Sequence, residues 1–523
     1  MKIAAPHNEA ASSSTDFIVG GLIFLIALLV FWFSPVHQVS DSDFSMLLSQ
    51  NLLEHGTFKL DRYVDAHSQP VAHKDYVEVG SRQLELVNDH VYYFFPPGSS
   101  VLSLPYVALL GAFGINPKDE SGTYGEMRIQ TSLAALLMAA LAFVFFFTAR
   151  LLLHTLWSSI IALGGVFGTQ VWSTASRGLW SHTWELLLIG IVIPLLVANE
   201  TGERKLKPVL LGSLLTWAYF VRPTSSIAMV AIAVYLFLDQ RRSLVWYAST
   251  LAAWLAGFVA YSWHNFSKLL PSYYAANRLD FSVFKIALAG NLISPSRGLL
   301  IYVPWICFTA YLLVRYRRSL DCRRIIWLSL TVVLGNLIVV SAFTHWWGGV
   351  SYGPRLTTDL LPWLVLLTIL GVRAMLHARA QGNVSAPLWK IELAAGALHL
   401  AHSVFTNGRG ATSVSTLRWN DYPKDDAGME AKIWDWKQAQ FLAGLVAPSP
   451  PQYYPELSGN YRIDLATTEA DKYLWQGWGR PEAGFRWTDG KEANVVFALD
   501  ASGDVDLRIH MAPLIVPGKI REQ

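Results

Sequence analysis

Two carboxylates, Asp41 and Asp43, stand where a long apolar stretch gives way to a polar one. They belong to the segment SDSDF, which comes almost directly after the uncharged apolar run 17–34. A carboxylate at such a boundary is either a hydrated helix cap or a general base that takes a proton from a hydroxyl group. The residue types alone leave both interpretations open.

Arginines recur in short aromatic- or glycine-rich segments between later apolar runs. A guanidinium group suits phosphate because its planar donors engage two oxygens at once. Any one of these arginines is explained equally well by a lipid headgroup or an acidic partner, but five together favour an anionic ligand. They are Arg128, Arg177, Arg222, Arg297 and Arg355.

Histidine and aromatic side chains accompany these arginines. His182 lies in STASRGLWSHTWE, and His345, Trp346 and Trp347 lie in THWWGGVSYGPRLTTD. The histidines are either interfacial hydrogen-bonding residues or part of a reaction site, and the tryptophans either belong to the interfacial aromatic belt or stack on a sugar ring. The belt is the commoner role for a tryptophan. Tyr93, in HVYYFFPPGSS, is a further candidate for substrate contact.

Composition identifies the elements that carry these residues. The chain has 523 residues, of which 53% are hydrophobic and 15% charged. Its apolar runs, of about 16 to 22 residues, are long enough to cross a hydrocarbon core of about 30 Å. The net charge of +3 gives no indication of nucleic-acid binding, and two cysteines make neither a disulfide framework nor a metal-ligand pattern. We predict an all-α polytopic membrane protein with spans at 17–34, 129–149, 157–173, 183–199, 207–221, 224–239, 243–262, 298–315, 324–343, 358–376 and 386–405.

Lysine and arginine bias predicts the orientation of these spans. The basic loops share one face, the cytoplasmic one, only if the apolar run 101–115 does not cross the membrane. We therefore predict that 101–115, which comes after Pro96-Pro97-Gly98, forms a second surface helix beside an amphipathic helix that starts near Phe44 and stops at Gly56. This interpretation gives a multi-pass protein of about 11 spans in a bacterial-type inner membrane. The tail 1–16 is then in the cytoplasm and the C-terminus is outside. The first outer loop is then 35–128.

The C-terminal part has a different pattern. Residues 406–453 indicate an irregular aromatic connector between the membrane domain 17–405 and a C-terminal domain at 454–523. Within that domain, the alternating stretches VVFAL and VDLRI and the turn pair Asp489-Gly490 predict a small extracytoplasmic β fold.

A carboxylate, several phosphate-binding cations and apolar surroundings suit sugar transfer from a lipid phosphate. Phosphate leaves as an anion and needs no proton, so one carboxylate is enough to deprotonate the acceptor hydroxyl, whereas glycoside hydrolases use two. The arginines would stabilise the charge that develops on the phosphate.

The order of these features resembles the GT-C membrane glycosyltransferases, in particular protein O-mannosyltransferases and the lipid A aminoarabinose transferase. The likeness covers about 17–380 and rests on the acid after the first span, the amphipathic helix, the YYFFPPG segment and the step from Glu126 to Arg128 into the second span. It implies a polyprenyl-phosphate-linked sugar donor, inversion at the anomeric centre and an aspartate base. Asp41 matches the family's aspartate, with Asp43 as a near alternative because Ser42 stands where the family often has glutamate. Arg128 matches the family's arginine.

The main hypothesis is an inverting transferase at the outer membrane face, among membrane lipids, with a lipid, glycan or protein as acceptor. Asp41 is the expected base, and Arg355, Arg128 and either Arg177 or Arg297 are expected to hold the phosphate. A divalent cation as a further phosphate ligand stays open, since the sequence shows no ligand triad. The alternatives are a transporter or flippase of an anionic lipid or sugar phosphate, which would use the arginines without chemistry, and a non-catalytic glycan-binding scaffold.

Overall fold

The structure is a computed structural model that describes residues 14–64, 70–73, 76–117, 124–275, 278–421, 426–446, 455–457, 459–475, 477–482, 484–488, 493–499, 506 and 508–512. The chain forms two compact units. One comprises Met1–Asn420 and Glu430–Pro448, and the other Asp421–Met429 and Ser449–Gln523.

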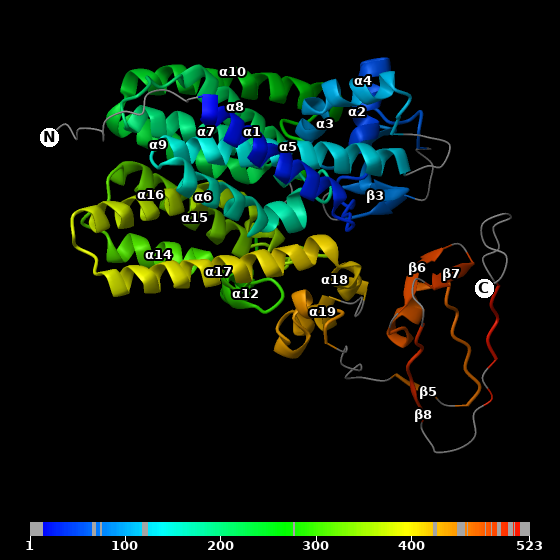
Figure 1. Cartoon of the computed structure of the whole chain (residues 1–523). Coiled ribbons are helices and arrows are strands. Elements are labelled where there is room, and N and C mark those ends of the chain that lie inside the picture. Colours follow the sequence, from blue (N-terminus) through cyan, green and yellow to red (C-terminus); the bar gives the residue numbers. More distant parts are fainter. Residues whose placement is uncertain are drawn as a thin grey trace. The chain divides into compact units, whose positions relative to one another are not determined.

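The larger unit is mainly helical, and most of its long helices run side by side (Figure 1). The helices of the chain are α1 (Ser14–Phe33), α2 (Ser45–His55), α3 (Gly98–Leu102), α4 (Leu104–Ala112), α5 (Tyr124–Arg150), α6 (Thr155–Phe167), α7 (Ser181–Glu200), α8 (Pro208–Val221), α9 (Ser226–Asp239), α10 (Arg241–Phe266), α11 (Ser272–Ala275), α12 (Phe284–Ile293), α13 (Leu299–Tyr302), α14 (Trp305–Arg315), α15 (Arg323–Ser341), α16 (Leu361–Ala380), α17 (Ala386–Thr412), α18 (Val414–Arg418) and α19 (Asp426–Ile433).

Six stretches of helix in the described part of the chain are long and apolar enough to cross a membrane. They are Ser14–Phe33, Gly125–Arg150, Ser181–Glu200, Arg241–Phe266, Arg323–Ser341 and Arg355–Ala380. Other predicted spans correspond to shorter apolar helices, such as α6, α8, α9 and α14. The prediction of a mainly helical protein with several membrane-spanning helices is confirmed. Helix α17 extends the weakest predicted span to Thr412, and α12 was not predicted.

Ion pairs bring several basic helix ends to one end of this unit. Arg150 Nη2, at the end of α5, lies 2.8 Å from Asp16 Oδ2 at the start of α1. Arg373 on α16 donates to the carbonyl oxygen of Leu152 at 2.9 Å and pairs with Asp321 at 2.5 Å. The start of α1 therefore lies near the end of α5, and the loop that joins the other ends of these helices emerges at the opposite end.

Short surface helices occupy this first loop, as predicted. Helices α2, α3 and α4 gather at one end of the long helices (Figure 1). Helix α4 has nine residues, about 14 Å of rise, which is too short to cross a membrane. Gly98, at the start of α3, packs directly on α8: an added Cβ would lie 2.5 Å from the carbonyl of Phe220.

A four-stranded antiparallel sheet, which we did not predict, also lies in the first loop. Its strands β1 (Pro70–Ala72), β2 (Val77–Val79), β3 (Ser81–Val87) and β4 (His90–Tyr93) pair in chain order. Asn88 and Asp89, which join β3 to β4, both have positive φ. Two such residues match the right-handed twist of a tight hairpin. The dipeptide between SRQLELV and HVYY was therefore a hairpin signal.

Glu85, on β3, makes the stability of this loop pH-dependent. Burial raises the pKa of its carboxyl from 4.5 to about 7. The folded chain therefore keeps a proton that the unfolded chain releases between these values. We expect the free energy of unfolding to fall by up to about 3 kcal/mol as pH rises from about 4.5 to 7. In Glu85→Gln the fall should be smaller by this amount, as measured by thermal unfolding in detergent between pH 4.5 and 8. Glu78, opposite Glu85 on β2, gives the matched control, and equal pH slopes in all three proteins would contradict the prediction.

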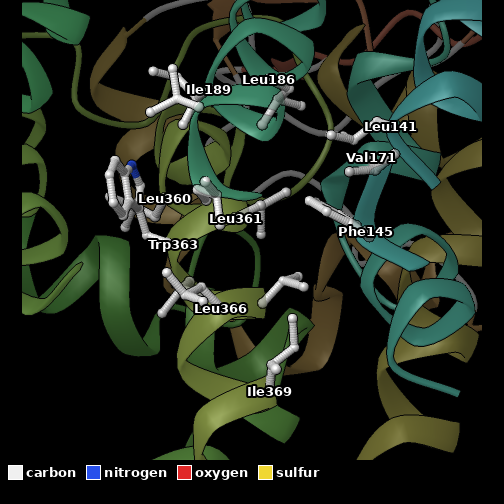
Figure 2. Close-up of a cluster of buried hydrophobic side chains, with 14 of the residues drawn as sticks. Leu141, Phe145, Val171, Leu186, Ile189, Leu360, Leu361, Trp363, Leu366 and Ile369 are labelled. Carbon is white, nitrogen blue, oxygen red and sulfur yellow. The ribbon is translucent and has the colours of Figure 1, made fainter. Parts of the chain in front are cut away.

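An apolar core holds α5, α7 and α16 together (Figure 2). Leu186 and Ile189 on α7 lie against Leu361 and Trp363 at the start of α16, and all four are almost fully buried. This contact fixes the first turn of α7 beside the short 3-10 helix η4 (Arg355–Leu360), which directly precedes α16.

The smaller unit contains short strands. Strand β5 (Glu456–Leu457) pairs in parallel with β8 (Ala498–Leu499), and β6 (Trp478–Glu482) pairs with β7 (Phe485–Thr488) in antiparallel. Small sheets were predicted in this region. The predicted strand VVFAL contributes β8, whereas Asp489-Gly490 and part of VDLRI lie outside the described residues. Part of the predicted connector, 430–448, belongs to the larger unit.

Candidate functional site

A cavity of about 420 Å³ lies between the first loop and the ends of the long helices. Residues far apart in the sequence line it, from Ser40 to Leu356. Its wall holds four arginines, two histidines and one carboxylate: Arg82, Arg222, Arg278, Arg355, His182, His345 and Asp41. This set favours an anionic ligand.

Asp41 faces the arginines of this cavity. Its Oδ2 accepts a hydrogen bond from Arg355 Nη1 at 3.0 Å, and its Oδ1 lies 3.5 Å from Arg82 Nη2. The side chain is about 30% exposed, so it stays accessible to a bound molecule. The residue expected to act as base and the arginine expected to bind phosphate are thus in direct contact.

The serines on either side of Asp41 are anchored to different elements. Arg82 Nη2 donates to Ser40 Oγ at 2.5 Å, which ties this side to the sheet. Ser42 Oγ donates to Gln130 Oε1 at 2.6 Å, and Gln130 Nε2 donates to the Ser42 carbonyl at 2.7 Å, which ties the other side to α5. Tyr93 completes the support: its hydroxyl donates to the Asp41 carbonyl at 2.7 Å. The Asp41 backbone is therefore held on three sides.

Glu126, at the start of α5, fixes helix α2 behind Asp41. Its carboxylate accepts hydrogen bonds from the backbone N–H groups of Met46 and Leu47 at 2.8 and 2.9 Å. The first N–H groups of a helix have no partner within it and carry partial positive charge, so a buried carboxylate satisfies them. Of the pair Glu126 and Arg128, it is therefore Glu126 that organises the first loop.

Asp43 has a local role. Its Oδ1 accepts from the backbone N–H of Phe44 at 3.2 Å, and Phe44 has a φ of 69°, in the left-handed region. Burial raises the pKa of Asp43. The side chain is not among those that line the cavity. The geometry therefore favours Asp41 over Asp43 as the residue that meets a ligand.

Arg355, in the cavity wall, contacts both Asp41 and an aromatic ring. Its guanidinium carbon lies 4.3 Å from the ring centroid of Trp180, which also lines the cavity. Stacking on an aromatic ring holds the planar donor group in place and leaves its edge for oxygen atoms. Gly348 and Gly349, which bring the preceding loop to this wall, both have positive φ.

The other predicted arginines divide into three groups. Arg222 lines the cavity, but its Nε already donates to Asp359 Oδ2 at 2.5 Å. Arg177 and Arg297 are buried away from it and act within the fold. Arg128 is exposed on α5 and does not line the cavity. The structure thus brings together Arg222 and Arg355 of the five.

Arg177 and Arg297 hold backbone carbonyls. Arg177 donates to the carbonyls of Phe31 and Ser34, the latter at 2.8 Å, and so caps the end of α1. Arg297 donates to the carbonyl of Trp347 at 2.8 Å and to the side chain of Gln440. Burial lowers the pKa of Arg177 to about 9 and that of Arg297 to about 10. Both position the loops that form the cavity.

Some of the predicted aromatic and histidine residues lie in the cavity wall and others do not. Tyr93, His182 and His345 line the cavity. Trp346 and Trp347 are buried and do not, and the Trp346 ring packs on the backbone of α12, where an added Cβ on Gly290 would lie 2.1 Å from it. Neither tryptophan therefore contributes to the wall of this cavity.

His182, Glu185 and Asp359 form a buried cluster beside the cavity, with ligand atoms within 4.8 Å of one another. His182 Nδ1 lies 2.6 Å from Asp359 Oδ1, and Arg222 and Thr224 donate to Asp359 Oδ2. These contacts engage both oxygens of Asp359, and a guanidinium group beside them opposes a second cation. The cluster therefore needs no metal ion to account for its geometry.

Sequence reasoning missed several residues of the site. Arg82 comes from the unpredicted sheet, whose hairpin dipeptide was visible, and the same sheet positions Tyr93. Arg278, which stacks over Tyr273 at 4.1 Å, and Asp359 carried no local signal. Their role depends on contacts between segments that are distant in the sequence.

Comparison with known proteins finds solved structures that are similar to this chain. No family model and no curated protein matches the chain. ArnT from Cupriavidus metallidurans, bound to undecaprenyl phosphate, gives a TM-score of 0.43 at 13% identity over 82% of this chain and 76% of ArnT. The oligosaccharyltransferase of Archaeoglobus fulgidus, in the apo form, gives 0.44 at 10% identity over 84% of this chain and 62% of that protein, less than two thirds of its length.

ArnT is the lipid A aminoarabinose transferase, one of the enzymes that the sequence itself resembles. Both neighbours are GT-C-fold transferases, the group that the order of the sequence motifs resembles.

Proposed function

We propose that this protein transfers a sugar from a polyprenyl-phosphate donor to an acceptor hydroxyl at the outer face of the membrane, with inversion and with Asp41 as base. One observation carries the proposal: Asp41 and four arginines share one cavity at the end of a bundle of apolar helices. The positive-inside rule supports an outer position for this end, because the basic helix ends lie at the other.

Ligand binding would change the contacts of Asp41. A lipid phosphate would engage Arg355, which now bonds Asp41 Oδ2, together with Arg82 and Arg278. The carboxylate would then be free to accept the proton of an acceptor hydroxyl as that oxygen attacks the anomeric carbon. The arginines would stabilise the departing phosphate, whose negative charge grows in the transition state.

A transporter would use the same cations but would leave the donor intact. The purified full-length protein, supplied with the lipid extract of its own cells, separates the two functions. We expect free polyprenyl phosphate to appear by mass spectrometry together with a matching gain of one sugar on another molecule. Movement of the intact lipid across a vesicle membrane without cleavage would overturn the proposal in favour of transport.

A further inference from the structure

The cavity wall contains a second group that can accept a proton. His182 lies in the first turn of α7 and lines the cavity together with Trp180 and Ser181. Its side chain is only about 2% exposed, so the ring is fixed by its neighbours. Unlike Asp41, it is paired with a carboxylate and not with a guanidinium group.

The partner of this histidine is held in place from the other side. Asp359 Oδ1 lies 2.6 Å from His182 Nδ1, and Asp359 Oδ2 accepts from Arg222 Nε at 2.5 Å and from Thr224 Oγ1 at 2.8 Å. Because a carboxylate paired with a guanidinium group accepts hydrogen bonds, His182 Nδ1 is the donor of this pair. Nε2 then has a free lone pair.

Asp41, His182 and Arg355 line the same cavity. Arg355 bonds Asp41 directly and stacks over Trp180, two residues before His182. A proton on Asp41 therefore has a second acceptor within the same cavity. The titratable and charged groups that face the His182 ring are Asp359, Glu185, Arg222 and Arg355. Arg222 and Arg355 oppose an imidazolium ion, and a bound phosphate would offset their charge.

We propose that His182 is a second proton acceptor of this site and that Asp359 is its positioning residue. The proposal rests on the proposed function. The acceptor hydroxyl gives its proton to Asp41 while its oxygen bonds to the anomeric carbon. The bond from that carbon to the phosphate oxygen breaks, and its electron pair stays on the phosphate. The proton then passes from Asp41 to Nε2 of His182, where Asp359 offsets the positive charge, and leaves to water.

Replacement of His182 by alanine tests this role in the full-length protein. We expect the release of polyprenyl phosphate from the cellular lipid extract to slow by about 10²-fold, the usual worth of a proton-transfer group. Binding of added undecaprenyl phosphate should be unchanged. Imidazole in the buffer should restore much of the rate, because it can occupy the space of the missing ring. His182→Gln, which fills that space, should be equally slow and should not respond to imidazole.

The chain offers a matched control. His90 Nδ1 lies 2.8 Å from Asp61 Oδ2, and this half-exposed histidine–aspartate pair is outside the cavity. His90→Ala should keep the wild-type rate with no response to imidazole. Full activity in His182→Gln, or a slow His182→Ala that imidazole does not restore, would overturn the proposal. If Asp41→Asn is inactive in the same assay, the transferase function survives that result; if wild type itself releases no polyprenyl phosphate, the proposed function fails.

Discussion

Replacement of Asp41 by asparagine is expected to reduce sugar transfer by about 10²- to 10⁴-fold, the range that a general base contributes. The amide cannot take the proton of the acceptor hydroxyl. Binding of undecaprenyl phosphate should be retained or become tighter, because the carboxylate that now occupies Arg355 and lies near Arg82 is removed. Rates of polyprenyl phosphate release and direct binding by the same purified protein measure the two effects.

Asp43→Asn is the control for this prediction. Asp43 is two residues away, bonds the Phe44 backbone and does not line the cavity, so its loss should mainly lower thermal stability. The opposite pattern, with an active Asp41→Asn and an inactive but folded Asp43→Asn, would move the base by two residues. Weaker lipid binding in Asp41→Asn would contradict the competition between Asp41 and phosphate.

Loss of Arg355 is expected to have the largest effect on donor binding. Arg355→Gln removes a charge-assisted hydrogen-bond donor from the cavity, and about 1.5 to 3 kcal/mol of lost interaction corresponds to roughly 10- to 100-fold weaker binding of undecaprenyl phosphate. Arg355→Lys should fall between wild type and Arg355→Gln, since an ammonium group keeps the charge but not the planar pair of donors.

Arg62 supplies the comparison for Arg355. It is an exposed arginine of the same first loop and is not among the residues that line the cavity, so Arg62→Gln should bind the lipid as wild type does. Thermal unfolding of each variant separates a lost contact from a lost fold. Unchanged affinity in a folded Arg355→Gln would assign phosphate binding to another part of the chain.

The sequence determined the features that depend on local pattern. Apolar runs of spanning length predicted the helices because a helix needs about 20 apolar residues to cross the hydrocarbon core. The basic loops predicted that 101–115 does not cross the membrane, and the structure has two short helices there. The position of Asp41 between the first span and an amphipathic helix was enough to make it a candidate base. Arg355 was a candidate from its own glycine-rich segment, and the two side chains are in contact although they are 314 positions apart.

Only the tertiary structure decided which arginines reach the cavity. The sequence segments around them are similar. In the structure, however, Arg177 and Arg297 donate hydrogen bonds to backbone carbonyls, and Arg128 is exposed outside the cavity. Arg177 and Arg297 bind carbonyl groups that have no partner in a helix, such as those at helix ends. Which carbonyl groups lie beside which arginine is decided only when the helices pack together. Arg82 entered the site through an unpredicted sheet.

The pairing of His182 with Asp359 was decided in the same way. The two residues are 177 positions apart, and the apolar contact between α7 and α16 brings their helices together. The sequence marked His182 as a candidate but gave no sign of its partner, because a buried carboxylate at a helix start looks the same in sequence as a solvated one. Local pattern therefore determined the elements and the first acid of the site, and packing between distant helices decided its cations and its second proton acceptor.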